Sequence, residues 1–118
     1  MKANTSVVLT VNDKQYILKY DIKALLKLEQ LISTKNIAKL VLNAPFSHGD
    51  TLMCLYIGLQ AEQPSVTEKK AMQILENYLK DNPLYMLQDI VLLALTKAGA
   101  VGNTKGDADT ETESEPGK

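Results

Sequence analysis

The residues best suited to chemistry in this sequence are Cys54 and His48, its only cysteine and its only histidine. A thiolate nucleophile needs a basic partner that lowers the thiol pKa, and the histidine lies six residues before the cysteine. Cys54, however, lies in an apolar run, TLMCLYIGLQA, where a buried structural thiol is the common case. We therefore interpret Cys54 as a core residue and His48 as a loop residue. We expect no enzymatic activity, no cofactor and no metal site.

Glu29 is a charged residue inside the apolar arc of the segment IKALLKLEQLI, residues 22–32. Its carboxylate either bonds a nearby backbone group or reaches the surface, which is the common arrangement, or it makes a contact that orients a partner. The apolar residues of this segment spread over roughly 220° at 100° per residue. An ordinary surface helix needs a stripe of about 100°. The pattern therefore predicts a helix that is covered on two sides.

Composition and charge limit the classes of function. All 13 basic residues are lysine, so the arginine contacts that readers of DNA and RNA favour are absent. No segment reaches the ~20 apolar residues of a membrane span, and no secretory signal is visible. The sequence thus favours a cytoplasmic protein that binds neither nucleic acid nor membrane.

The chain divides into a body and a tail. Residues 1–99 are expected to form a single globular domain, because a chain of this length can bury a core without disulfides or metal. Residues 100–118 contain no large apolar residue other than Val101 and are rich in Asp and Glu, a composition that predicts a disordered acidic tail.

The alternation of apolar residues in 6–11 and 14–20 predicts a β-hairpin around Asn12-Asp13, a pair that tolerates a tight turn. The remaining periodic segments, from about 21 to 98, predict four to five helices. The expected fold class is therefore α+β, mostly α, with the hairpin packed on a small helical bundle. Asp21 is expected to cap the first helix, and Ser47 with Asp50 to form a capping box at a later one. Ser65 or Thr67 is expected to cap the next helix. The helix after it should begin with Asn82 as its cap before Pro83, and it should end at Gly99 as its C-cap.

Gly58 lies within the apolar helix predicted for residues 51–61. Glycine costs a helix interior up to ~1 kcal/mol relative to alanine, so its presence predicts the close approach of another backbone. We expect that neighbour to be the helix that begins near Thr67 or the helix that follows Pro83.

Two predicted helices, 51–61 and 84–98, are apolar nearly all round, which is more than one small core needs. One can lie in the centre, while the other exposes a stripe or buries it against a partner. The alternative is that the last helix is also central and fully covered. If its other apolar side chains face inward, an outer line remains on the last helix, consisting of Met86, Ile90, Leu93 and Lys97. We predict that this outer line contacts a partner.

The order of these elements resembles the tail assembly chaperones of long-tailed, siphovirus-like bacteriophages and related gene-transfer-agent proteins. The resemblance covers roughly residues 6–98: a hairpin leads into a helix with the pair Leu28-Glu29, a buried helix ends in Ile57-Gly58-Leu59, and a later helix opens with Ser65-Val66-Thr67-Glu68. Proteins of this family are small and non-catalytic.

The resemblance implies a function and a location. Such a protein binds the long, helical tape measure protein and keeps it soluble while tail tube subunits polymerise around it. It would act in the cytoplasm of the bacterial host and be absent from the mature virion. Its partners would be the tape measure protein and also the tail tube protein, with self-association as a further contact.

Other classes of function stay open. The chain could be a structural virion component, such as a head–tail connector or a minor tail protein, or another small helical module for protein–protein interaction. An enzyme or a DNA-binding regulator would need a polar pocket or a basic face, and the sequence indicates neither.

Overall fold

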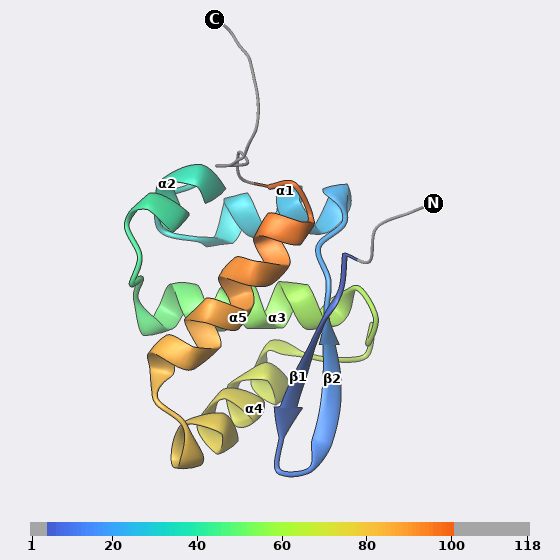
Figure 1. Cartoon of the computed structure of the whole chain (residues 1–118). Helices are drawn as coiled ribbons and strands as arrows, with labels where there is room; N and C mark the ends of the chain where they lie inside the picture. Colours follow the sequence, from blue (N-terminus) through green and yellow to red (C-terminus); the bar gives the residue numbers. More distant parts are fainter. Residues whose placement is uncertain (1–4, 101–118) are drawn as a thin grey trace, which may run out of the picture.

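The computed structural model describes residues 5–100, and within this range it confirms an α+β fold that is mostly α (Figure 1). The predicted acidic tail lies almost entirely outside the described residues and stays a prediction. In chain order the elements are β1 (Val7–Val11), β2 (Lys14–Leu18), α1 (Ile22–Leu31), α2 (Ile37–Leu42), α3 (His48–Gln60), α4 (Glu68–Asp81) and α5 (Leu84–Lys97).

The hairpin forms as the alternation predicts. β1 and β2 are antiparallel, with Leu9 opposite Tyr16 and the turn at Asn12 and Asp13. Both turn residues have positive φ, 52° and 67°, which is the conformation that a two-residue hairpin turn of this hand requires. Leu9 and Leu18 on the inner face are fully buried, so the hairpin is held by the helices beneath it.

α3 is the centre of the fold. It lies between α1 and α4, α5 crosses it, and β2 also contacts it (Figure 1). The hydroxyl of Ser47 accepts a hydrogen bond from the Asp50 N–H at 3.0 Å, which confirms the predicted cap. A capping box also requires the Asp50 carboxylate to accept from the Ser47 N–H. This part of the prediction is wrong, because the carboxylate accepts from the N–H and hydroxyl of Ser33 instead. His48 is the first residue of α3 and not a loop residue.

α1 begins at the predicted cap, since the Asp21 carboxylate accepts from the Ala24 N–H at 2.8 Å. The prediction that α1 is covered on two sides is wrong. Ala24 and Leu28 are buried against α3, whereas Ile22 and Leu26 are 71% and 58% exposed. The side of α1 that carries Ile22 and Leu26 is therefore open to solvent in the described chain.

Glu29 supports the start of α2. Its carboxylate accepts a hydrogen bond from the Ile37 N–H at 3.0 Å, and the Asn36 side chain accepts from the Lys39 N–H at 2.8 Å. The first helical N–H groups need such acceptors because they have no partner inside the helix. Of the two interpretations of Glu29, the structure thus shows the bond to a nearby backbone group.

The starts of α4 and α5 test two of the predicted helix caps. Thr67 caps α4 by accepting from the Lys70 N–H at 3.1 Å, and Ser65 does not serve as the cap. Asn82 does not cap α5, because it ends α4, where its backbone N–H donates to the Tyr78 carbonyl at 3.0 Å. Pro83 stands at the N-cap of α5 without a side-chain hydrogen bond, so the predicted boundary is shifted by one residue.

The end of α5 agrees with the prediction. Gly99 has a φ of +76° directly after the C-cap. Its N–H donates to the Thr96 carbonyl, and the Ala100 N–H donates to the Leu95 carbonyl, each at 3.0 Å. This pair of bonds defines a Schellman motif, in which a residue with positive φ satisfies the last carbonyl groups of a helix.

Gly58 allows a close approach, as predicted, but the neighbour is a different element. The backbone N–H of Lys19, just after β2, donates to the Gly58 carbonyl at 3.0 Å. A Cβ atom on Gly58 would lie 2.5 Å from Leu18 Cδ2 and 2.7 Å from Tyr20 Oη. The expectation that α4 or α5 passes here is therefore wrong: the glycine makes room for the end of the hairpin.

Candidate partner-binding surface

α5 is anchored on the core by one face. Leu87, Val91, Ala94 and Leu95 are fully buried, as the predicted inward arc requires. Because burial of these apolar side chains is favourable, it determines which face of α5 is turned toward the core.

Gln88 lies among these apolar side chains and is only 3% exposed. Its side-chain amide donates to the Phe46 carbonyl at 2.6 Å and to the Thr51 hydroxyl at 2.9 Å. This contact links the beginning of α5 to the beginning of α3. Gln88 was not among the predicted functional residues, although a polar residue inside an apolar arc was an available signal.

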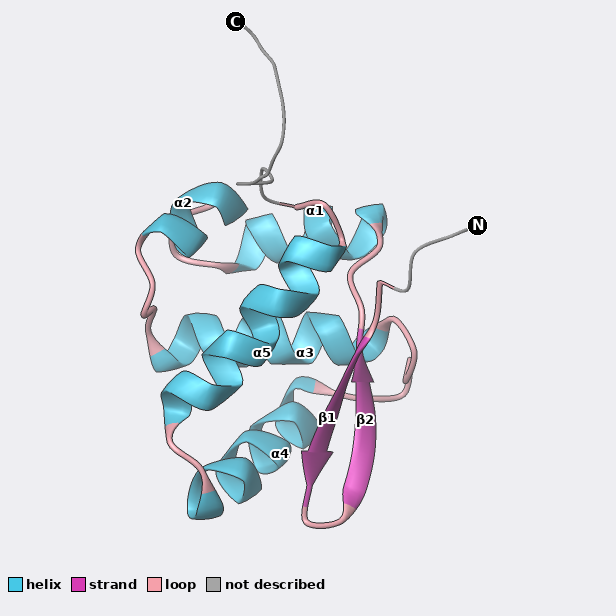
Figure 2. Ribbon diagram, viewed as in Figure 1, coloured by secondary structure: helices cyan, strands magenta, loops and turns pink. Residues whose placement is uncertain are grey.

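The outer line lies on the opposite face of α5. Met86 and Leu93 are 40% and 49% exposed, while Ile90 is partly buried against the core. Lys97 is exposed, and its ammonium group donates to the Ser6 carbonyl at 3.4 Å. The alternative in which α5 is central and fully covered is thus wrong for the described chain, since α5 lies at the front of the molecule over α3 (Figure 2).

Tyr85 extends this surface at the beginning of α5, where it is 62% exposed. Asp89 and Thr96 also face solvent on this side of the helix. The face is therefore mixed: an apolar stripe along Met86, Ile90 and Leu93 runs beside polar groups. Such a pattern is typical of a surface that can exist in water and bind another protein.

α1 presents a second apolar surface, although this side of the helix was predicted to be covered. Ile22 and Leu26 are four residues apart, so their side chains lie on the same face of the helix. These two side chains are more exposed than Met86 and Leu93 of α5, and they are flanked by Lys23 and Lys27. The wide apolar arc of α1 was the sequence feature that indicated this surface, but it was interpreted as burial on two sides.

Cys54 is confirmed as a core thiol. It is fully buried, and burial together with the negative charge of Asp50 raises the pKa of the thiol from 9.0 to about 12. Tyr20 donates a hydrogen bond to the Cys54 carbonyl, and burial raises the Tyr20 pKa well above its ordinary value. A raised thiol pKa is the opposite of what a nucleophilic cysteine needs.

A hollow of about 350 Å³ lies between the first half of α1 and the end of α3. Asp21 and Lys27 at its rim already have partners, since Asp21 caps α1 and the Lys27 ammonium donates to the Gln60 side chain at 3.4 Å. Within residues 5–100, no three His, Cys, Asp or Glu side chains gather as a metal site would require.

No helix in the described range has the length and apolar character needed to cross a membrane. Comparisons with protein-family models, with curated proteins and with solved structures find no significant match.

Proposed function

We propose that this protein is a bacteriophage tail assembly chaperone that binds the tape measure protein through the outer line of α5 and keeps it soluble during tail assembly. The observation that carries the proposal is the exposure of Met86 and Leu93 on a helix whose other face is firmly buried. The order of the elements, which resembles that chaperone family, supports the same function.

The spacing of the outer line suits a helical partner. Met86, Ile90 and Leu93 follow one another at intervals of four and three residues, so they form a ridge along one side of α5. A ridge of this kind packs into the groove between side-chain rows of a second helix. A tape measure protein is long, helical and apolar, and so offers the complementary surface.

The energetics favour contact through apolar groups. A side chain such as Leu93 contributes ~1.5–3 kcal/mol when it passes from full exposure to full burial, and a half-exposed one contributes about half of that, before the cost of ordering both partners is counted. Few charges take part, with Lys97 at one end of the line. Binding should therefore change little between low and moderate salt.

The proposed chaperone acts in the cytoplasm of the bacterial host and leaves the tape measure protein before the virion is complete. The tail tube protein is a further proposed partner, because its subunits must replace the chaperone on the tape measure protein. A structural tail or connector protein would instead stay in the particle. Analysis of purified particles for this chain separates the two functions.

The direct test is co-expression with the tape measure protein encoded in the same phage genome. We expect the wild-type chain to move the tape measure protein into the soluble fraction. The double variant Met86→Ser with Leu93→Ser should lose this effect, because it removes the exposed part of the stripe. Ile90 is left unchanged, since it also packs against the core.

The matched control is the double variant Ile22→Ser with Leu26→Ser, which removes the exposed apolar pair of α1. It should solubilise the tape measure protein as well as the wild type does. If the α1 variant fails while the α5 variant succeeds, the binding surface is on α1. If the wild-type chain leaves the tape measure protein insoluble, the proposed function is wrong.

A further inference from the structure

The two edges of the hairpin are closed to different degrees. In an antiparallel pair, the N–H and C=O groups of alternate residues point away from the partner strand. Because the residues that flank the two-residue turn bond to each other, the outward groups belong to Gln15, Ile17 and Lys19 on the β2 side. On the β1 side they belong to Ser6, Val8 and Thr10.

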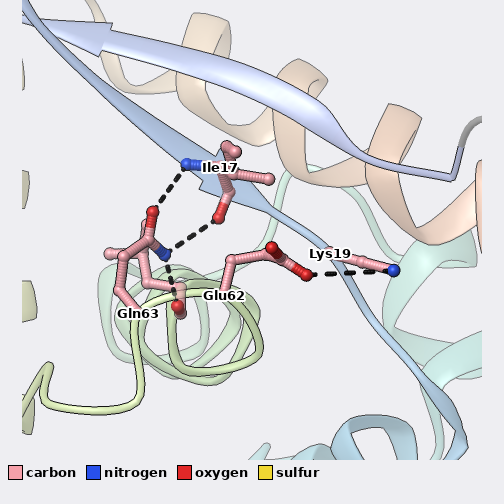
Figure 3. A network of polar contacts seen from close by, with 5 residues as sticks. Ile17, Lys19, Glu62 and Gln63 are labelled. Atoms are coloured by element: carbon pink, nitrogen blue, oxygen red, sulfur yellow. Dashed lines mark hydrogen bonds and ion pairs between the residues drawn. The ribbon is translucent and has the colours of Figure 1, made fainter.

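The β2 edge is closed by the body of the protein. The side-chain amide of Gln63 accepts from the Ile17 N–H at 3.0 Å and donates to the Ile17 carbonyl at 3.2 Å (Figure 3). The next outward N–H, that of Lys19, donates to the Gly58 carbonyl. The Gln63 amide thus takes the place that a neighbouring strand would have, and it blocks addition of another strand at this position.

The β1 edge is covered at its start, where the Lys97 ammonium donates to the Ser6 carbonyl, but not along the middle of the strand. In residues 5–100, no hydrogen bond reaches the outward N–H and C=O groups of Val8 and Thr10. Both residues are exposed, Val8 by 53%. The strand VVLTV also lacks the lysine, proline or bulge with which proteins usually protect an open edge.

We propose that β1 pairs with β1 of a second copy of the chain, antiparallel, about a two-fold axis at Leu9. Val8 of each copy then lies opposite Thr10 of the other, and each copy donates two hydrogen bonds and accepts two. The two hairpins become one continuous antiparallel sheet. This pairing uses the whole of β1, because Val7 of one copy lies opposite Val11 of the other.

Charge complementarity favours a second copy as the occupant of this edge. In the proposed register, Asp13 in the turn of one copy lies opposite residue 5 of the other. That end of β1 is where Lys97 donates to the Ser6 carbonyl. Asp13 of each copy therefore comes beside Lys97 of the other, and the symmetry makes two such pairs. Val8 and Thr10 between them are uncharged and β-branched, which suits neighbours across strands.

This self-association goes beyond the proposed function and uses a different element, although Lys97 belongs to both surfaces. It is tested on the full chain without tape measure protein, by sedimentation equilibrium between about 10 µM and 1 mM, the range in which a small interface associates. The wild-type chain should pass from monomer to dimer with increasing concentration.

Thr10→Pro is the decisive variant and Gln15→Pro is its matched control. The two residues lie opposite each other, and neither N–H takes part in the hairpin, so proline removes an outward donor without breaking a bond between β1 and β2. Thr10→Pro should weaken dimerisation by about tenfold or more, because symmetry removes two hydrogen bonds. Gln15→Pro, at the other edge, should leave it within about twofold.

Circular dichroism shows whether the proline variants fold. If Thr10→Pro unfolds, the proposal is tested instead through the pair of Asp13 and Lys97. Asp13→Lys should weaken the dimer, and adding Lys97→Glu should restore it. A wild-type chain that stays monomeric throughout overturns the proposal. So does equal weakening by Thr10→Pro and Gln15→Pro, or a charge exchange that restores nothing.

Discussion

α3 and α5 are two helices of similar apolar composition with opposite places in the fold. α3 contacts α1, β2, α4 and α5, and its side chains from Cys54 to Leu59 are buried or nearly so. α5 buries one face and leaves Met86 and Leu93 in solvent. Apolar content alone therefore does not decide which helix becomes central.

Particular residues account for the difference. Gly58 lets the end of β2 approach α3 so closely that a backbone hydrogen bond forms between them. Asp50 at the other end of α3 binds Ser33 after α1. α5 has a buried link through Gln88, which lies on the inward face, and an exposed one from Lys97 to the Ser6 carbonyl. A helix becomes central when its polar and small residues meet neighbours on several sides.

The largest expected effect comes from filling the space at Gly58. Gly58→Leu should lower the free energy of unfolding by about 3 kcal/mol or more, at or above the usual upper end for overpacked cores. The physical reason is that even the Cβ atom would overlap Leu18 and Tyr20, both buried. Chemical denaturation of the variant and the wild type measures the difference.

Gly49 supplies the control within the same helix. A Cβ atom there would meet only the Ser47 hydroxyl, at 3.9 Å. Gly49→Ala should leave stability unchanged or raise it by up to ~1 kcal/mol, because alanine favours a helix. Equal destabilisation by both substitutions would contradict the idea that β2 sets the requirement for glycine in α3.

An intermediate effect is expected from alkaline pH through Cys54. The folded chain holds the thiol pKa at about 12, against 9.0 when exposed, so folding favours the protonated thiol. Its contribution to stability is complete below pH 9 and is lost as the pH rises toward 12. At about pH 10.5 this lowers the free energy of unfolding by about 2 kcal/mol.

Cys54→Ala isolates the thiol from the lysines and tyrosines that titrate in the same range. Urea denaturation at about pH 7.5 and pH 10.5 should show a smaller loss of stability in the variant than in the wild type. An identical loss in the two proteins would mean that Cys54 is not desolvated in α3 as the structure shows.

The smallest expected effect is on the exposed side of α5. Leu93→Ser should lower the free energy of unfolding by about 1 kcal/mol or less, because much of this side chain is already in water. Thermal unfolding of the purified variant is the measurement. The same change at Leu95, two residues further on and fully buried, should cost about 3 kcal/mol or more. Similar costs at both positions would show that α5 is covered on both sides.

The sequence predicted features that depend on neighbours along the chain. The turn at Asn12 and Asp13, the cap at Asp21 and the glycine after α5 all follow from local backbone requirements. The inward arc of α5 was also predictable, because helical spacing alone sorts its residues onto two faces. The placement of Met86 and Leu93 on the outside follows from the same spacing.

Features set by contacts between distant segments were not predictable. The spacing in α1 cannot show that nothing lies over Ile22 and Leu26, and the presence of Gly58 cannot show which element approaches it. The role of Gln88 depends on the Phe46 carbonyl, which belongs to a loop 42 residues away. The partner proposed for the outer line rests on the family resemblance, because helical spacing predicts a ridge of side chains and not what binds it.

The hydrogen bond from Lys97 to the Ser6 carbonyl joins residues 91 positions apart, at the two ends of the described body. Contacts of such sequence separation form late, because the intervening chain must be ordered first. During translation, β1 therefore waits for α5 to leave the ribosome before the native arrangement around it is complete. Until then the nascent chain also exposes the side of α3 that α5 later covers. A protein that is proposed to protect another from aggregation thus exposes apolar surface of its own until α5 has been synthesised.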